Sequence, residues 1–318
     1  MKMVVTGGAG FIGSNLVDKL IENGHEVSVI DNFSTGKKKN CNNRAQYFDL
    51  DLSDSNNLDS FKDILRNVDT IFHCAALARV QPSITNPIEY EINNTLGLIN
   101  ILKSSVDMKV RKFVYSASSS AYGPTDNLPS KENDLPNPIS PYANQKYYGE
   151  LCCKMFSKVY DIETVSLRYF NVYGERQNLG GAYATVVGIF LDQASKGKPL
   201  TINGDGTQRR DFTYVGDVVK ANILASKSNK VKDGQAINIG SGKNISINDL
   251  ANLIYHKKIY LDPVDEPFEN LADINKAKAL LNWTPTVSIH DWIKKIYWYE
   301  RKFLVEKLDK KFIKKWKI

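Results

Sequence analysis

The chain has 318 residues, of which 42% are hydrophobic and 24% charged, a composition typical of a globular protein with one large domain or two. It contains no run of about 18 uncharged apolar residues, which argues against a membrane span. Of its net charge of +7, +6 lies in residues 301–318, and the nearly neutral remainder argues against a nucleic-acid-binding groove across the body.

The start of the chain and its cysteines indicate the compartment. Met1–Val5 is already a strand-like apolar run, which leaves no room for a secretory signal. The cysteines, Cys41, Cys74, Cys152 and Cys153, have no spacing typical of a metal site or a disulfide framework. We therefore expect a cytoplasmic protein with reduced cysteines and no metal site.

The first thirty-one residues predict one βαβ unit. The apolar run Met1–Val5 leads into the glycine-rich turn Thr6–Gly13, and a helical pattern follows and ends at Gly24. A second strand, Glu26–Ile30, ends in Asp31. Such glycines let the backbone turn tightly and approach a pyrophosphate at the positive end of the helix. Because all parts of the motif occur in order, a dinucleotide site is favoured over a glycine turn that binds nothing.

Asp31 indicates which dinucleotide binds. It follows Gly13 by eighteen residues, close to the spacing of about 20 at which a carboxylate binds a ribose 2′-hydroxyl. A carboxylate repels the 2′-phosphate of NADP. Lys37–Lys39 could attract that phosphate, but a lysine run in a loop is more often a solvated surface. We therefore expect NAD.

Strand-like and helical patterns alternate through the first half of the chain. Further strands are predicted at 46–48, 70–74, 112–116 and 164–168. This alternation predicts an α/β fold with a Rossmann-like, doubly wound parallel sheet, whose ligands bind at the carboxyl ends of the strands.

After residue 170 the pattern breaks into glycine-punctuated loops and short strands such as Leu200–Ile202. Gln235–Ile239 resembles a strand that returns to the main sheet. We therefore predict an NAD-binding domain over 1–170, with a return strand near 235–240, and a smaller, interleaved C-terminal substrate-binding lobe over most of 171–318. In the tail at 301–318, a helix that packs on the body is favoured over a membrane-surface helix.

Three residues are candidates for catalysis. Ser118 lies at the end of the 112–116 strand, and Tyr142 and Lys146 lie four residues apart, on one face of a predicted helix. A nearby ammonium lowers the pKa of a tyrosine towards the range of a general base. The same lysine can bind cofactor ribose hydroxyls, and the serine can bridge the tyrosine and a substrate hydroxyl. Alone the pair could be a surface coincidence, but behind a dinucleotide motif a catalytic role is favoured.

The chain resembles the extended short-chain dehydrogenases/reductases of the NAD-dependent epimerase/dehydratase family, from Met1 to about Tyr299. Within that family it is most similar to UDP-hexose 4-epimerases, particularly those acting on UDP-N-acetylglucosamine. The motifs that carry the resemblance are Thr6–Gly13, Asp31, His73–Ala76, Asn94, Ser118, Tyr142 with Lys146, Arg168–Gly174, Asn203–Gly206 and Arg210–Phe212.

The resemblance implies the members of two sites. In the cofactor site Asp51 and Leu52 would contact adenine, Asn94 would brace the nicotinamide side through the serine strand, and Tyr169 would lie near the nicotinamide. The cofactor-binding residues would be Gly7, Gly10, Phe11, Ile12, Gly13, Asp31, Asn32, Asp51, Leu52, Ala75, Ala76, Asn94, Tyr142, Lys146 and Tyr169. The substrate-binding residues would be Arg79, Ser118, Asn171, Arg210 and Asn270, with Asn171 and Arg210 on the diphosphate.

The resemblance also implies the reaction. Tyr142, assisted by Ser118, would take the C4 hydroxyl proton of a UDP-sugar while the C4 hydride passes to NAD⁺. The sugar would then turn and take the hydride back on its other face, so that the net reaction is isomerisation. Related 4,6-dehydratases carry an acid pair at the positions of Ser119 and Ser120, so we expect no dehydration.

Three positions depart from the family or bear on the substrate. The family's sugar-pocket gate aligns with Asn270, which is small enough to admit an N-acetyl group but could be an ordinary loop residue. Where the family usually has a second phosphate-binding arginine, this chain has Pro263. Arg176 or Lys258 could take over the role of that arginine. Directly before the lysine, where the family usually has Ser or Thr, this chain has Gln145, to which we assign no function.

Other functions stay open. The chain could epimerise another nucleotide sugar such as UDP-glucuronate, reduce a keto-sugar with NADH, or be a catalytically silent NAD-binding regulator. Family members commonly dimerise through the helices that hold Asn94 and Tyr142, so we expect a homodimer.

Overall fold

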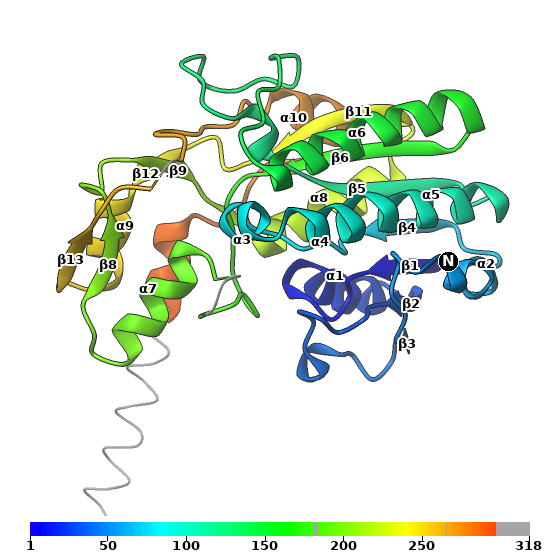
Figure 1. The fold of residues 1–318 in the computed structure, drawn as a ribbon, viewed down its shortest axis with the longest axis horizontal. Helices are drawn as coiled ribbons and strands as arrows, with labels where there is room; N and C mark the ends of the chain where they lie inside the picture. The colour runs from blue at the N-terminus through cyan, green and yellow to red at the C-terminus, as the bar shows by residue number, and fades with distance from the viewer. Residues whose placement is uncertain (181–183, 265, 297–318) are drawn as a thin grey trace, which may run out of the picture.

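The computed structural model describes residues 1–180, 184–264 and 266–296. Its centre is a parallel sheet of seven strands in the order β11-β6-β5-β4-β1-β2-β3 (Figure 1). The strands are β1 (Lys2–Thr6), β2 (Glu26–Ile30), β3 (Gln46–Phe48), β4 (Thr70–His73), β5 (Lys112–Ser118), β6 (Glu163–Tyr169) and β11 (Asp233–Ile239). The strand order reverses between β1 and β4, and ligands of doubly wound sheets bind at that reversal. The predicted fold class is confirmed, and the predicted return strand β11 pairs with β6.

Helices cover both faces of the sheet. Buried residues of α1 (Phe11–Glu22), α8 (Val215–Lys227) and α10 (Asn275–Leu281) pack on one face. Those of α2 (Leu58–Leu65), α5 (Gly97–Asp107) and α6 (Pro141–Tyr160) pack on the other. Strands covered on both sides need apolar residues at successive positions, which is why β1 has the buried run Met3–Val5.

Short segments link β4 to α5 and lie beside α6. These are α3 (Val80–Thr85), α4 (Pro87–Glu91) and the single π-helical turn η3 (Ile92–Leu96), which leads directly into α5. All three contact α6, and Figure 1 shows α3, α4 and α5 following one another along it. The 3₁₀ turns η1 (Lys38–Asn40), η2 (Ser55–Asn57) and η4 (Ser119–Tyr122) lie elsewhere in the first half of the chain.

A smaller lobe lies beyond the carboxyl end of the sheet, at the left of Figure 1. Its core joins Phe190, Leu200, Leu250 and Trp292. Its elements are β7 (Val172–Tyr173) paired with β10 (Thr213–Tyr214), β8 (Leu200–Asn203) with β13 (Lys258–Leu261), β9 (Arg209–Asp211) with β12 (Asn244–Ser246), α7 (Val186–Ser195), α9 (Ile247–Ile254) and a helix over 289–296.

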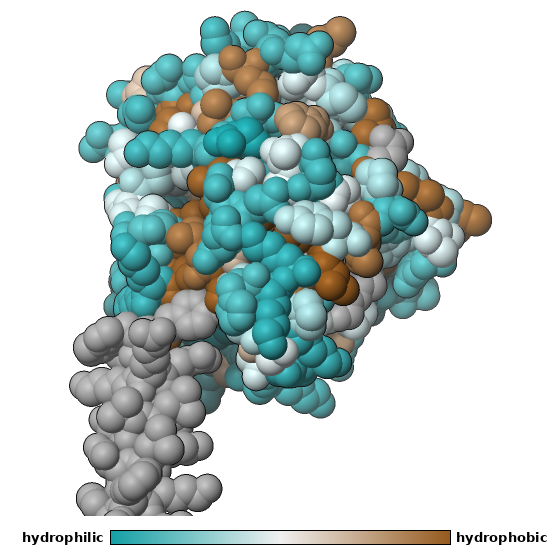
Figure 2. Space-filling view, turned by 90° about the vertical axis from the view of Figure 1, so that its left-hand side faces the viewer, coloured by the Kyte–Doolittle hydropathy of each residue, from teal (hydrophilic) through white to brown (hydrophobic). Residues whose placement is uncertain are grey.

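The surface of the smaller lobe is mixed in character. On the face turned to the viewer in Figure 2, apolar side chains are scattered among hydrophilic ones. Among the described helices, none combines the length and the hydrophobicity needed to cross a bilayer. The helix expected over 301–318 lies outside the described residues.

Candidate active site

A cleft opens at the carboxyl ends of β1, β2 and β4, where the strand order reverses. Most of the predicted cofactor residues come together in its lining. They are Gly7, Gly10, Phe11, Ile12, Gly13, Asp31, Asn32, Asp51, Leu52, Ala75 and Ala76.

The glycine turn fits a dinucleotide. Gly7 has a φ of +69°, and a Cβ there would lie 2.7 Å from the Ala75 nitrogen. Gly10 has an ordinary φ of −79°, and a Cβ there would have only the Gly7 oxygen, at 3.2 Å, within 4 Å. The side chain that Gly10 lacks therefore leaves the cleft open at the start of α1. The N-cap residue of α1 is Gly10, which has no side chain to cap the helix, and the first turn of α1 contains no acid, so its positive end is available to a phosphate.

Two carboxylates in the cleft suit the hydroxyl groups of a cofactor. Asp31 is 7% exposed and accepts hydrogen bonds from the Ala9 nitrogen (2.9 Å) and the Phe33 nitrogen (2.8 Å). Burial raises the pKa of Asp31, and these two bonds oppose that rise. Asp51 accepts a hydrogen bond from Asn32 Nδ2 at 3.1 Å. Each carboxylate oxygen has more than one acceptor position, so both side chains can still bind a ribose or an adenine donor.

The catalytic candidates meet where β5 ends and α6 begins. Ser140 caps α6 by accepting a hydrogen bond from the Ala143 nitrogen at 3.2 Å, and Pro141 occupies the first helical position. This start of the helix brings the Tyr142 phenol close to the Ser118 hydroxyl, whose influence opposes the rise that burial causes in the pKa of the phenol. The backbone nitrogen of Tyr142 donates to Ser83 Oγ of α3 at 3.2 Å, which fixes the residue from a second side. The structure therefore brings Ser118 and Tyr142 together, and their catalytic roles stay predictions.

The expected effect of Lys146 on Tyr142 is wrong. Burial raises the pKa of Tyr142, and the influences that oppose it are the Ser118 hydrogen bond and the charge of Arg79. The Lys146 ammonium donates to the Ser116 carbonyl at 2.7 Å and lies 6.0 Å from the centre of the Tyr142 ring. Burial lowers the pKa of Lys146 to about 8. Burial is therefore the largest influence on the phenol, and the lysine ammonium is bound to β5 instead.

Among the predicted cofactor residues, Asn94, Tyr142, Lys146 and Tyr169 do not line the cleft, and Asn94 is bonded differently from expectation. Asn94 braces Leu77 in the loop after β4, not the serine strand: its Oδ1 accepts from the Leu77 nitrogen at 2.8 Å, and its Nδ2 donates to the Leu77 oxygen at 3.0 Å. The buried Tyr169 hydroxyl bonds with Ser116 Oγ (3.2 Å) and with Asn222 Nδ2 (2.9 Å). Both residues therefore support elements that surround the cleft.

The substrate candidates fall in two places. Arg79 lines the cleft, with burial lowering the pKa of its guanidinium. Asn171 and Asn270 meet in the smaller lobe, where Asn171 Nδ2 donates to Asn270 Oδ1 at 3.0 Å. Asn270 Oδ1 also accepts from the Asp211 nitrogen at 2.9 Å, so Asn270 cross-links two segments of this lobe.

Arg210 is 9% exposed and already holds an anion. Its Nη2 pairs with Glu266 at 3.1 Å, and its Nη1 donates to the Phe268 oxygen at 3.0 Å. The two cations suggested in place of an arginine at position 263 are engaged elsewhere, Arg176 with Asp18 and Lys258 with Asn252.

The sequence reasoning missed one anchor of the smaller lobe. The buried carboxylate of Asp211 accepts four hydrogen bonds, from the Ser241 nitrogen and hydroxyl (both 2.7 Å) and the Gly242 and Ala272 nitrogens (both 3.1 Å). Burial raises the pKa of Asp211, and these bonds oppose that rise. The available sequence signal was that Asp211 belongs to the motif Arg210–Phe212, which the chain shares with the family.

Gln145, to which no function was assigned, is also buried and hydrogen-bonded to Asn94. Its departure from the family's usual Ser or Thr was the available signal, but the sequence did not reveal its partners, which come from segments far away in the chain. Within the described residues, no group of three or more His, Cys, Asp or Glu side chains is placed to hold a metal ion.

Residues 3–240 match the model of the NAD dependent epimerase/dehydratase family. Three solved structures are similar to nearly the whole chain. The UDP-glucose 4-epimerase of Thermotoga maritima, solved with UDP-glucose, is 38% identical, with 96% of this chain and 100% of that chain covered at a TM-score of 0.89. The UDP-N-acetylglucosamine 4-epimerase of Methanobrevibacter ruminantium, solved with UDP-N-acetylmuramic acid, is 36% identical, with 95% and 98% covered at 0.86. The UDP-glucuronic acid 4-epimerase of Bacillus cereus, solved with UDP-glucuronic acid and NAD, is 35% identical, with 95% and 100% covered at 0.86.

Proposed function

We propose a specific activity for this chain, which belongs to the NAD dependent epimerase/dehydratase family. It is a nucleotide-sugar 4-epimerase that inverts C4 of a UDP-hexose, interconverting UDP-GlcNAc with UDP-GalNAc, UDP-Glc with UDP-Gal, or both. The observation that supports this best is that the Tyr142 phenol lies close to Ser118 and to the cleft-lining Arg79, which both oppose the rise that burial causes in its pKa.

The chain's own residues carry the proton transfer. When bound, NAD⁺ supplies a hydride acceptor and a positive charge beside the reacting carbon. Tyr142 takes the proton of the C4 hydroxyl, and Ser118 holds phenol and hydroxyl in line. Tyr142 returns the proton once the sugar presents its other face. Ser119 and Ser120 offer no acid to expel a C6 hydroxyl, so the reaction stops at epimerisation.

The diphosphate binds between the cleft and the smaller lobe. Arg210 offers a planar donor fork, and a diphosphate would take the place of the Glu266 carboxylate that it now holds. Asn171 donates a hydrogen bond to Asn270, the residue that aligns with the family's sugar-pocket gate. The small side chain at position 270 favours a pocket with room for an N-acetyl group.

A UDP-glucuronate 4-epimerase is the second candidate, because the Bacillus cereus relative is nearly as similar as the two hexose epimerases. Incubation with UDP-GlcNAc, UDP-Glc and UDP-GlcA side by side, without added cofactor, separates the candidates by product analysis. We expect conversion of UDP-GlcNAc or UDP-Glc. Conversion of UDP-GlcA alone would replace the first candidate by the second, and NAD binding without turnover of any of the three would favour a regulator.

We also propose that the chain forms a homodimer through the helices around Asn94 and Tyr142. Large apolar side chains are exposed on neighbouring turns of these helices, which soluble proteins normally cover. They are Ile88, Ile92, Leu96, Leu151, Met155 and Val159, with 42–75% of their surface exposed.

A further inference from the structure

Gln145 lies between Tyr142 and Lys146 in sequence, yet its side chain joins other elements. It is 2% exposed. Its Oε1 accepts a hydrogen bond from Asn94 Nδ2 of η3 at 3.0 Å, and its Nε2 donates to Glu91 Oε2 of α4 at 3.0 Å. Both ends of the buried amide are therefore bonded, to two segments that precede α5.

The hydrogen bonds with Gln145 and with the Leu77 backbone together determine which way round the Asn94 amide lies. Oxygen and nitrogen of an asparagine amide are alike in shape, so the partners decide which end faces which group. Because Gln145 Oε1 accepts only, it requires the Nδ2 end of Asn94. The other contacts of Asn94 then match the Leu77 backbone, with the oxygen on the Leu77 nitrogen and Nδ2 on the Leu77 oxygen.

Leu77 connects the hydrogen-bonded side chains of Gln145 and Asn94 to the cleft. It belongs to the loop Ala75–Arg79, all of whose residues line the cleft. A buried donor or acceptor left without a partner is unfavourable, so a loop held at both polar groups of one residue resists displacement.

We propose that Gln145 is a positioning residue, which orients the Asn94 amide between α6 and the Ala75–Arg79 loop and so holds that loop in the shape that retains NAD. The hydroxyl of Ser or Thr, the usual residues here, stands closer to the backbone and offers one oxygen where Gln145 offers a separate donor and acceptor. This role rests on the proposed function only in that the cleft holds NAD.

The test measures how fast resident NAD exchanges with labelled NAD in the purified full-length protein. Gln145→Met removes both hydrogen bonds with little change of volume, and we expect at least about tenfold faster exchange. Gln145→Glu still accepts from Asn94 but sets a carboxylate against Glu91, so exchange should also be faster. Adding Glu91→Gln to that variant restores one amide and one carboxylate to the pair, and exchange should return to within about twofold of the wild-type rate.

Gln193→Met is the matched control, because Gln193 also makes two hydrogen bonds, both to Thr201, outside the cleft lining. It should melt at a lower temperature and exchange NAD at the wild-type rate. Wild-type exchange in Gln145→Met, or no recovery in the double variant, would overturn the proposal; if Gln145→Met does not fold, the double variant decides alone. A wild-type chain that binds NAD but epimerises none of the three sugars contradicts only the proposed function, and one that binds no NAD contradicts both.

Discussion

The ionisation of one phenol controls the chemistry proposed for this chain. Burial raises the pKa of Tyr142, which by itself would keep the phenol protonated at neutral pH. The Ser118 hydrogen bond and the Arg79 charge favour the phenolate. The proposed role of Tyr142 as a base therefore depends on these two neighbours and on the positive charge that bound NAD⁺ would add.

Tyr142→Phe removes the only atom that takes the proton in this mechanism. General acid–base catalysis contributes about 10²–10⁴-fold, so we expect kcat to fall by roughly 10³-fold. Product analysis with UDP-Glc and UDP-GlcNAc measures the loss, and unchanged NAD content shows that the fold survives. Turnover within tenfold of the wild type would exclude Tyr142 as the base.

Ser118→Ala should move the pH profile of kcat in a defined direction. The Ser118 hydrogen bond lowers the pKa of Tyr142, so its loss raises that pKa and the phenolate forms only at higher pH. The acidic limb of kcat against pH should shift upward, with the largest loss of activity at low pH. Ser119→Ala is the neighbouring control and should leave the limb in place. An unshifted limb in Ser118→Ala would show that the serine acts by another route.

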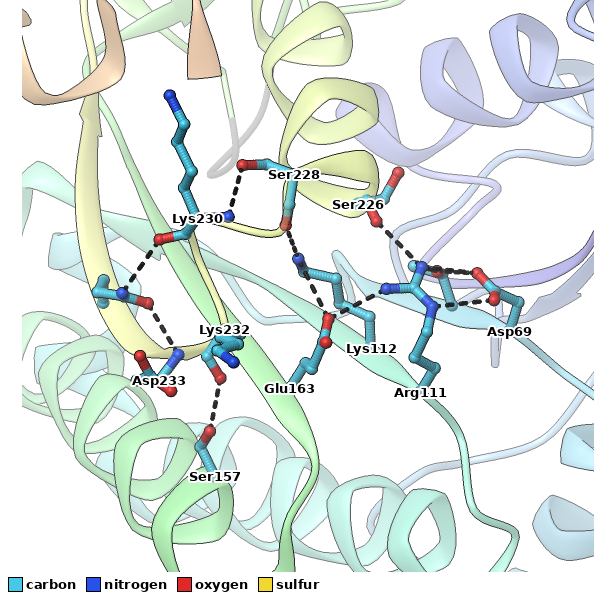
Figure 3. Close-up of polar contacts among 12 residues, drawn as sticks. Asp69, Arg111, Lys112, Ser157, Glu163, Ser226, Ser228, Lys230, Lys232 and Asp233 are labelled. Atoms are coloured by element: carbon cyan, nitrogen blue, oxygen red, sulfur yellow. Dashed lines mark hydrogen bonds and ion pairs between the residues drawn. The ribbon is translucent and has the colours of Figure 1, made fainter. Parts of the chain in front are cut away.

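Among the elements, charged residues join the amino ends of neighbouring strands, opposite the carboxyl ends that form the cleft. Figure 3 shows their contacts. Arg111, just before β5, donates to both Asp69 oxygens at 3.0 Å and to Glu163 of β6 at 3.0 Å. The neighbouring Lys112 is fully buried, 3.5 Å from Glu163, and donates to the Ser228 carbonyl at 2.5 Å. Glu163 is thus the shared anion of two cations.

Glu163→Gln tests this cluster. Removing one partner of a buried charge leaves that charge poorly compensated, so we expect the free energy of unfolding to fall by about 1–3 kcal/mol. Asp59→Asn breaks the exposed Lys62 pair and should change it by less than about 0.5 kcal/mol. Urea denaturation measures both, and the proposed activity should be unaffected because the cluster lies away from the cleft. Equal effects of the two substitutions would mean that Glu163 acts as an ordinary surface charge.

Local patterns predicted the elements well, because a buried strand appears in the sequence as a short apolar run, often with glycines in the turns beside it. The second strand, Glu26–Ile30, has the predicted bounds. The partners of polar side chains were harder to predict: Asn94 bonds with Leu77 and Gln145, and Gln145 is 51 residues away. Such bonds depend on how α6 lies against η3. The same holds for Tyr142, whose pKa is raised by burial that only the folded chain creates.

At the scale of the whole molecule, the proposed dimer would cover the exposed apolar turns of α4, η3 and α6. Met155→Glu places a charge among them and should convert a dimer into a monomer in analytical ultracentrifugation. Leu135→Glu, on a loop residue that is 90% exposed, is the control and should not change the mass. A wild-type chain that sediments as a monomer would contradict the dimer itself.

We expect His73 to contribute to the pH dependence of the free energy of unfolding. The ring is buried between Phe113 and Tyr115, its Nδ1 lies 2.9 Å from Thr6 Oγ1, and burial together with the Lys146 charge lowers its pKa to about 3. Between that value and the unfolded value of 6.5, the unfolded chain binds a proton that the folded chain does not. Stability therefore rises with pH through this window, by up to about 1.4 kcal/mol per pH unit.

Urea denaturation at pH 7 and pH 5 tests this expectation. Protonation of His73 in the unfolded chain should lower the free energy of unfolding by about 2 kcal/mol between these two values. His25, whose pKa is also lowered, adds to the total, so the comparison that matters is with His73→Gln. That variant starts less stable, because it loses the packing of the ring, but its loss between pH 7 and pH 5 should be smaller by about the same 2 kcal/mol. Parallel pH curves for the two proteins would show that His73 is not kept neutral by the fold.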